Sequence, residues 1–113
     1  MSEDGWRTSI RWVVAHPTQA RVLLLAGRDG ARCLPRTERP GQVWTAEPGQ
    51  VLPGLRDLLG ADALLLRCLD EHEDPSARVQ RATLLVEPRA LPALPDGLAW
   101  AGWAELAGAA GDG

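Results

Sequence analysis

The sequence contains no phenylalanine, tyrosine, lysine or asparagine, so its aromatic side chains are five tryptophans and its twelve basic side chains are all arginines. We interpret this skew as the codon usage of a GC-rich genome, which favours a bacterial source, rather than as a functional demand for arginine. Hydrophobic residues make up 45% of the chain and charged residues 24%, which is typical of an ordinary folded domain. The composition therefore argues against an intrinsically disordered chain.

The chain also lacks a basic cluster, a long apolar run and a paired-cysteine motif. Its net charge of -3 is spread along the whole sequence, which argues against nucleic acid as a partner. No apolar run approaches the roughly 18 residues that span a bilayer, and the first residues are acidic and polar, so we expect a cytoplasmic protein without a membrane segment. Cys33 and Cys68 lie 35 positions apart, which predicts buried free thiols rather than a zinc site or a disulfide.

The common catalytic motifs are missing as well. No GxSxG, P-loop or GxGxxG sequence occurs, and the two histidines, His16 and His72, are both expected in turns. The acidic run at residues 70–74 holds four carboxylates and one imidazole, which are groups that can bind a metal. Because neighbouring residues of a strand point to opposite faces, we expect a surface hairpin there instead of a metal site.

A chain of 113 residues is long enough for one compact domain, which buries about two-thirds of the surface that the unfolded chain exposes. We expect a single domain over residues 1–113, with flexible ends at 1–8 and 111–113. Alternating polarity, apolar runs and turn residues predict strands at 9–15, 21–26, 31–34, 63–69, 78–87 and 97–100. The strands at 63–69 and 78–87 are expected to form an antiparallel hairpin, and residues 36–49 and 88–95 are expected to form long loops.

One main helix is indicated at residues 51–59. Its apolar stripe consists of Val51, Leu52, Leu55, Leu58 and Leu59. Pro53 is tolerated only in the first turn of a helix, and Gly60 fits the C-terminal cap. A second, short helix is expected at residues 103–110.

Four short sequences resemble landmarks of the Nudix hydrolases and occur in the same order. They are LP at residues 34–35, EPGQ at 47–50, RDL at 56–58 and WAGWAEL at 100–106, which are similar to the strand end, the E-P-G-E turn, the R-E-L segment and the W-x-x-x-x-E-L ending of that family. The resemblance covers nearly the whole chain. It implies an α/β (α+β) domain, with a Nudix-like mixed β-sheet, one main helix and a short C-terminal helix. The chain is also similar to the small N-terminal modules that precede phosphotransferase-like domains.

In the family that the chain resembles, the motif G-x5-E-x7-R-E-U-x-E-E-x-G-U supplies glutamates that hold divalent cations against a diphosphate. Three registers of this motif on the present sequence all fail to provide the metal-binding pair of acids. Asp57 is the only acidic residue between Pro48 and Ala61. The resemblance therefore implies a catalytically degenerate domain without a metal site, which acts as a ligand-binding, regulatory or interaction module.

The alternative is an active Mg²⁺-dependent hydrolase that cleaves a nucleoside diphosphate derivative. Glu47 and Asp57 would then be the catalytic acids, with further acids recruited from Asp62, Glu71 or Glu73. A structural interpretation is also open, because an acid such as Glu47 favours the N-terminal end of the helix macrodipole and Asp57 suits a solvated helix face.

Three residues are candidates for ligand binding. Trp44 lies in the expected loop before the helix and can stack on a ring, and Arg39 beside it can bind a phosphate group. Arg56 stands at the arginine position of the motif, although it also fits an ordinary solvated face. Packing over the sheet is the alternative for Trp44, and Trp12 is expected in the core. We expect the partner to be a nucleotide-like small molecule or a protein.

Overall fold

The computed structural model describes residues 5–26, 32–45, 47–90 and 93–105. The elements in chain order are β1 (Arg7–Val14), β2 (Arg21–Ala26), β3 (Arg32–Cys33), β4 (Arg36–Pro40), α1 (Pro48–Leu59), β5 (Ala63–Asp74), β6 (Val79–Pro88) and β7 (Leu98–Gly102). A short helix begins at Trp103, and the rest of the segment expected to be helical, 106–110, lies outside the described residues, as do residues 111–113.

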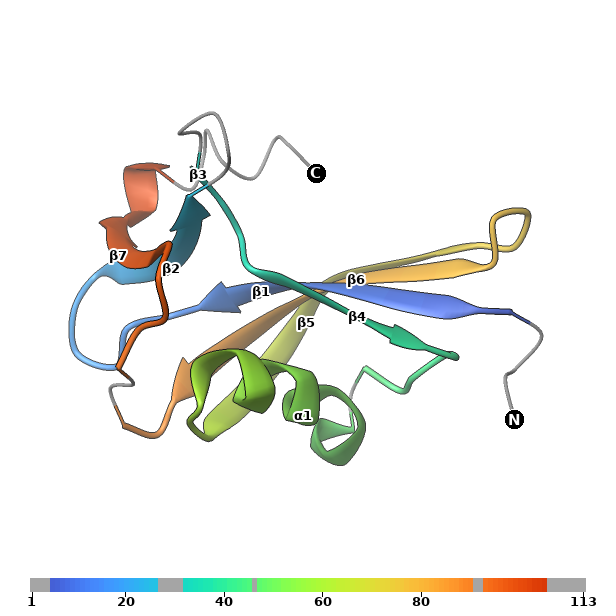
Figure 1. Ribbon diagram of the computed structural model, residues 1–113, viewed down its shortest axis with the longest axis horizontal. Coiled ribbons are helices and arrows are strands. Elements are labelled where there is room, and N and C mark those ends of the chain that lie inside the picture. The colour runs from blue at the N-terminus through green and yellow to red at the C-terminus, as the bar shows by residue number, and fades with distance from the viewer. Residues whose placement is uncertain (1–4, 27–31, 46, 91–92, 106–113) are drawn as a thin grey trace.

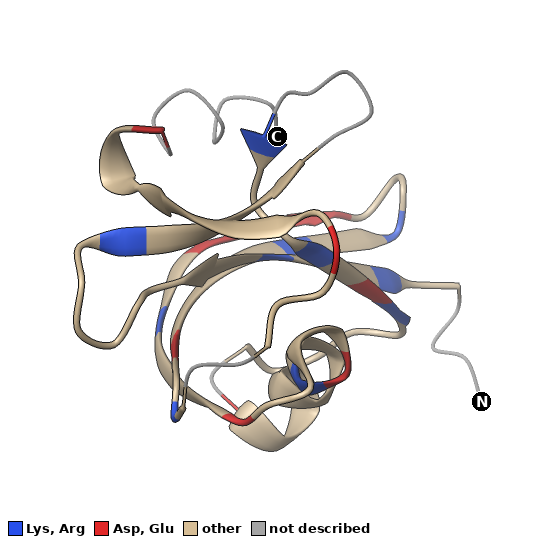
Figure 2. Ribbon diagram, turned by 60° about the vertical axis from the view of Figure 1, so that its left-hand side comes forward, with Lys and Arg blue, Asp and Glu red and all other residues tan. Residues whose placement is uncertain are grey.

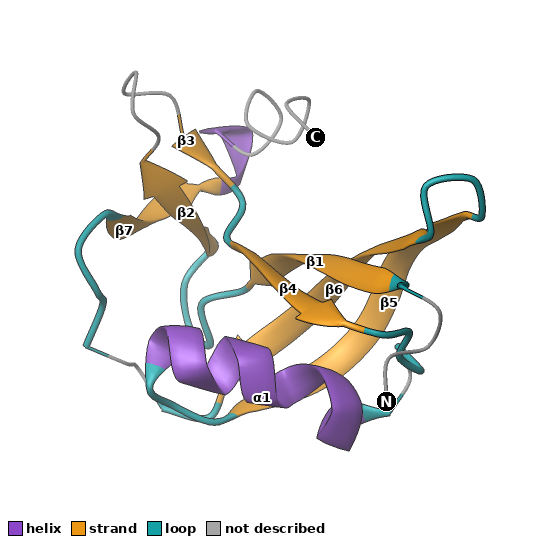
Figure 3. Ribbon diagram, turned by 45° about the vertical axis from the view of Figure 1, so that its right-hand side comes forward, coloured by secondary structure: helices purple, strands orange, loops and turns teal. Residues whose placement is uncertain are grey.

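The strands form two sheets, and α1 lies across one face of the larger sheet (Figure 1 and Figure 3). The larger sheet has the order β4-β1-β6-β5 and the smaller has the order β3-β2-β7. β1 and β6 run parallel, whereas the other pairings of the described strands are antiparallel. This mixed sheet with one main helix and a short C-terminal helix confirms the expected α+β fold class.

The main core lies between α1 and the inner face of the larger sheet. The buried residues of this core include Ile10, Trp12 and Val14 of β1, Leu84 and Val86 of β6, and Val51, Leu52, Leu55 and Leu59 of α1. Trp12 is fully buried, as expected, and its indole N–H donates to the hydroxyl of Thr37 on β4 at 2.9 Å. A buried indole requires such a partner, so the bond fixes β4 against β1 while the ring fills the core.

A second, smaller core lies on the opposite face of the larger sheet, at one end. Val13 of β1 packs there with Val22 and Leu24 of β2, Leu34, and Ala101 of β7. The smaller sheet therefore covers the outer face near the C-terminal end of β1 (Figure 1). Because β1 contributes to both cores, it has buried side chains on both of its faces.

The expected hairpin is confirmed, but β5 continues to Asp74 instead of ending at residue 69. The acidic run therefore lies within a strand, and His72 is a strand residue rather than a turn residue. Register shifts between Leu65 and Arg67 and between Cys68 and Asp70 bend this edge strand. At the turn, bonds from the Ala77 amide and then from Ser76 hold the pKa of the Asp74 carboxyl below its ordinary value.

Two expectations about the segment before and within α1 are wrong. Residues 36–40, expected in a loop, form β4, which pairs with β1 through a register that sets Thr37 opposite Ile10. α1 begins at Pro48, so Pro53 lies beyond its first turn. Proline lacks the N–H that would bond the carbonyl four residues earlier, and this loss is offset by the four buried residues of the helix.

The remaining boundaries are close to those expected. The helix ends as predicted, with Gly60 in the left-handed conformation at a φ of 69° and its N–H bonded to the carbonyl of Arg56. β1 begins at Arg7 and includes Thr8, although a flexible segment was expected through that residue.

Cys33 and Cys68 are free thiols, as expected, but each is only half-buried. No helix among the described residues is long and apolar enough to cross a membrane.

We predict that Leu55→Ala lowers the free energy of unfolding by about 2 to 5 kcal/mol, because it leaves a cavity between α1 and the sheet. Leu55 is 1% exposed, whereas Leu66 on the edge strand is 49% exposed and serves as the matched control. Urea denaturation of the parent, Leu55→Ala and Leu66→Ala measures the difference. Equal destabilisation by both substitutions would contradict this packing.

Candidate functional site

A groove of about 300 Å³ lies between α1 and β4. Residues of both elements line it, among them Thr37, Glu38, Arg39, Gln50, Gly54 and Asp57. Gly54 lets the two elements approach closely, because a Cβ atom at this position would lie 3.3 Å from the Thr37 hydroxyl oxygen. The groove therefore brings together two of the residues selected from the sequence, Arg39 from the strand and Asp57 from the helix.

Arg39 reaches across the groove and donates from Nη1 to the backbone carbonyl of Gln50 in the first turn of α1. A guanidinium has five N–H donors in all, so most of them are left for another partner. Asp57 is exposed and forms no ion pair or hydrogen bond with the described residues. The groove thus has the guanidinium of Arg39 on the side of β4 and the carboxylate of Asp57 on the side of α1.

Two glutamine side chains hold the connection between β4 and α1 in place. Gln50 accepts the backbone N–H of Trp44 at 2.9 Å. Gln80, which is 1% exposed, accepts the backbone N–H of Val43 at 3.0 Å and donates to the carbonyl of the same residue at 2.9 Å. This buried amide also accepts from the Thr8 hydroxyl at 3.1 Å. The connection is therefore anchored by side-chain amides instead of by a β-ladder.

A second hollow, of about 240 Å³, lies on the other side of this connection. It is lined by Gln42, Val43, Trp44, Glu71, Glu73 and Gln80. The Glu71 carboxylate is held by the Thr45 hydroxyl at 3.1 Å and by the Gln80 amide at 2.9 Å. Trp44 is 75% exposed, so it does not pack over the sheet. Gln50 contacts both Arg39 and Trp44, which makes the groove and the hollow neighbours.

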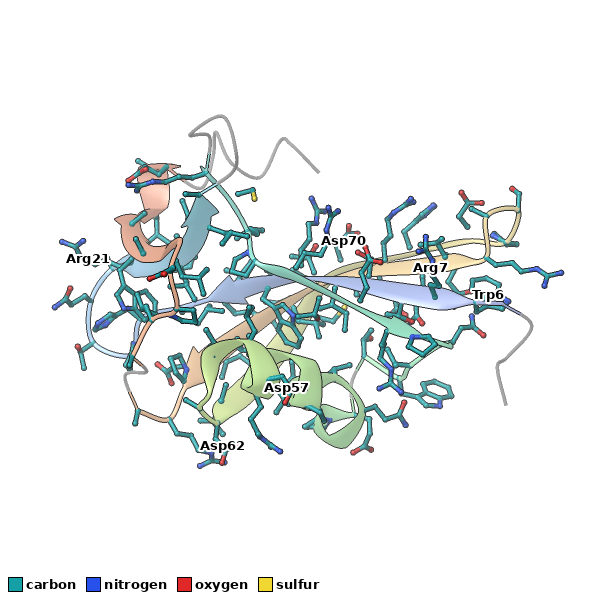
Figure 4. All side chains as sticks on the ribbon, viewed as in Figure 1. Trp6, Arg7, Arg21, Asp57, Asp62 and Asp70 are labelled. Atoms are coloured by element: carbon teal, nitrogen blue, oxygen red, sulfur yellow. The ribbon has the colours of Figure 1, made fainter. Side chains whose placement is uncertain are left out.

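Arg56 lies at the far end of the helix and lines neither the groove nor the hollow. Its Nε atom forms an ion pair with Asp62 at 2.6 Å. Figure 4 shows Asp62 beyond the end of α1, at a distance from Asp57. Both partners are more than half exposed, so this pair contributes little to stability.

Comparisons with known proteins identify relatives of the structure but not of the sequence. No protein-family model matches the chain, and no curated protein matches its sequence. A Nudix hydrolase from Nitrosomonas europaea superposes with a TM-score of 0.63 at 11% identity, over 90% of this chain and 60% of that one. The chain has a Nudix-like fold.

Two further structures are similar to this Nudix-like domain. The C-terminal domain of mouse MUTYH, solved in complex with human PCNA, gives a TM-score of 0.58 at 21% identity over 91% of this chain and 77% of that one. A Sinorhizobium meliloti 1021 protein provisionally assigned as an oxidoreductase gives a TM-score of 0.62 at 21% identity over 94% of this chain. The Nudix-like domain spans about a third of the length of that larger protein, 34%.

Glu47 and Asp57, the two acids that the sequence offered as catalytic, do not converge in the Nudix-like domain. Glu47 is the N-cap residue of α1 and Asp57 follows ten positions later, which corresponds to roughly 15 Å along the helix axis. The positions three and four residues from Asp57 are Pro53, Gly54, Gly60 and Ala61. None of these carries a ligand, and the described residues contain no group of three His, Cys, Asp or Glu side chains that could hold a metal ion.

Two residues of the site, Gln50 and Gln80, were not selected from the sequence, and Glu71 was considered only as a recruited acid. Gln80 was recognisable in principle, because it occupies an inward position of β6 in the same register as Ala82, Leu84 and Val86. A polar residue in an apolar register needs buried partners. Its partners at Val43 lie 37 positions away, and no local pattern connects the two segments.

We predict that Gln80→Leu loosens the connection before α1. The substitution leaves the N–H and carbonyl of Val43 buried without partners, so the free energy of unfolding should fall by about 1 to 3 kcal/mol. Hydrogen exchange of the Val43 amide, measured by NMR, should accelerate at the same time. Gln42→Leu is the matched control, since Gln42 is exposed and its side chain forms, among the described residues, one hydrogen bond, to Glu73 at 3.4 Å. Unchanged protection of Val43 in Gln80→Leu would contradict the anchoring role.

Proposed function

We propose that this Nudix-like domain is a catalytically degenerate module that binds a nucleotide-like small molecule without hydrolysing it. The observation that carries the proposal is the isolation of Asp57 on the exposed face of α1. Nudix-type chemistry, as the resemblance implies it, requires several carboxylates on one helix face, and the residues around Asp57 offer proline, glycine and alanine. The acids present therefore do not fit a magnesium centre of that type.

The binding part of the proposal is supported by the adjoining groove and hollow. Arg39 has free donors for a phosphate group, and an arginine fork binds phosphate oxygens in pairs. Trp44 offers an exposed indole face on which a base can stack. A ligand that spans the two would place its phosphate at Arg39 and its base at Trp44, on either side of Gln50.

The charge of the hollow favours a base that carries an amino group. Glu71 and Glu73 are acceptors beside Trp44, and Glu71 is held in place by two hydrogen bonds. Carboxylates accept hydrogen bonds from the exocyclic amino group of adenine. We therefore infer an adenine nucleotide as the first ligand to test, bound with its phosphates in the groove and its base in the hollow.

A role in protein interaction is a second candidate, supported by one comparison. The mouse MUTYH domain of the same fold was solved in a complex with another protein, human PCNA. A purely interacting domain would not be stabilised by any nucleotide, because only a ligand that binds the native state raises the melting temperature.

We predict that ADP binds the domain and that Trp44→Ala weakens this binding by about 1 to 3 kcal/mol, the range for base stacking on an aromatic side chain. Isothermal titration calorimetry measures the dissociation constants of the parent and the variant. Trp103→Ala is the matched control, because Trp103 is also partly exposed but follows β7, outside the groove and the hollow. Equal loss of affinity in both variants, or no binding to the parent, would contradict the proposed site.

We also predict that the domain does not cleave the phosphoanhydride bond of ADP, ADP-ribose or other nucleoside diphosphate derivatives in the presence of Mg²⁺ or Mn²⁺, so that no nucleoside monophosphate is formed. The rate for the parent should equal the rates for Asp57→Asn and Glu47→Gln, and all three should match the rate without protein. An established Nudix hydrolase run in parallel shows that the assay detects turnover. Formation of nucleoside monophosphate that both substitutions abolish would establish the alternative, an active hydrolase.

A further inference from the structure

The outer face of the larger sheet carries an arginine patch, defined by Arg7, Arg11, Arg36 and Arg81. Arg7 and Arg11 come from β1, Arg36 from β4 and Arg81 from β6. The inward neighbours of these residues, such as Ile10, Trp12 and Ala82, belong to the main core, so the arginines point to the opposite face. Figure 4 shows Arg7 on the side of the sheet away from Asp57 and α1, and Figure 2 marks basic positions on neighbouring strands.

The register of the strands places these cations side by side. Arg11 lies directly opposite Arg36 in the pairing of β1 with β4. Ser9 lies between Glu38 on one side and Arg81 on the other. Directly opposed residues of an antiparallel pair have Cβ atoms about 5 Å apart, and like charges in that arrangement destabilise the sheet. The patch therefore imposes an electrostatic cost on the fold.

The carboxylates of Glu38, Asp70 and Asp74 offset part of this charge. Arg7 forms an exposed ion pair with Glu38 at 3.8 Å, and none of the other three arginines forms an ion pair with the described residues. Asp70 and Asp74 lie on β5 at the rim of the patch, and one oxygen of Asp74 is engaged by the hairpin turn. The four arginines thus retain unused donors.

A hollow of about 100 Å³ lies at the centre of the patch. It is lined by Arg7, Thr8, Ser9, Arg36, Glu38, Val79 and Arg81. Three guanidinium groups thus surround a space that contains one carboxylate and one serine hydroxyl. Guanidinium groups bind the oxygens of a phosphate group in pairs, and a hydroxyl supplies a further donor.

We propose that this arginine patch binds a phosphate group of a small molecule. The small hollow suits a compact anion, and the domain's net charge of -3 disfavours a nucleic-acid backbone. A bound phosphate places negative charge beside Arg36 and Arg81 and so relieves the repulsion that the strand register creates. The site lies on the opposite face of the sheet from the groove with Arg39, and the proposal does not depend on the proposed function.

The test measures the melting temperature of the domain with inorganic phosphate, pyrophosphate or a sugar phosphomonoester at millimolar concentration and constant ionic strength. A ligand that binds the native state raises the melting temperature, and the increase grows with the logarithm of the ratio of ligand concentration to dissociation constant. We expect Arg36→Gln and Arg81→Gln to weaken binding at least tenfold. Arg36→Gln should also raise the melting temperature without any added anion, because it removes the like-charge contact with Arg11.

Two control variants separate this site from other basic surfaces. Arg21→Gln removes an exposed arginine at the first position of β2, at the other end of the molecule (Figure 4), and should leave binding unchanged. Arg39→Gln removes the cation of the α1 groove, so any stabilisation that it abolishes is assigned to that groove and the remainder to the patch. Which of the three anions binds most tightly distinguishes a free phosphate from an esterified one.

Three outcomes would overturn the proposal. One is the absence of stabilisation of the parent by all three anions. Another is an equal loss of binding in Arg21→Gln and Arg36→Gln, which would indicate unspecific attraction to arginine. The last is a loss confined to Arg39→Gln, which would assign the anion to the groove and leave the patch without a role.

Discussion

β1 contributes buried side chains to both cores of the domain, and this constraint determines the positions of α1, the smaller sheet and the groove. Trp12, Val13 and Val14 are consecutive and all buried, because the strand is covered by α1 on one face and by the smaller sheet on the other. β4 and β6 flank the same strand in the sheet. The indole of Trp12 bonds Thr37, which faces Gly54, so the position of the helix, and with it the groove, follows from the packing of one strand.

The connection that carries Trp44 is tied to this framework by side chains rather than by backbone pairing. Gln80 bonds both backbone groups of Val43 as a strand residue would, and it does so from inside the core. Gln50 performs a similar role from the first turn of α1. Amides that bond two consecutive residues, Val43 and Trp44, can present the exposed indole in a fixed place, which is a general requirement for binding without a large ordering cost.

Elements with strong local patterns were predictable, and those defined by distant contacts were not. The helix stripe, its Gly60 cap and the pairing of β5 with β6 followed from apolar spacing and turn residues. β4 has the sequence RTERP, which has no apolar alternation because the edge strand meets the core through Thr37 alone. Arg39 and Trp44 were selected as candidates from their chemistry, but their relation to Gln50 depends on folding β4 against α1. The partnership of Gln80 with Val43 likewise joins segments far apart in sequence.

The residues that pack α1 against the sheet differ from those on its exposed face, which explains how a Nudix-like fold can exist with so few acids on this helix. Val51, Leu52, Leu55 and Leu59 attach α1 to the sheet, whereas Arg56 and Asp57 point to solvent and contribute little to packing. Removing a carboxylate from the solvated face of a helix costs the fold almost nothing, and packing two like charges on that face carries a cost of its own. Folding therefore places no demand on the acids of α1, and only a function that uses them would retain them. On the outer face of the larger sheet, Arg11 and Arg36 lie opposite each other, and this pairing of like charges lowers stability. Packing does not explain the pairing, so folding does not require these arginines either.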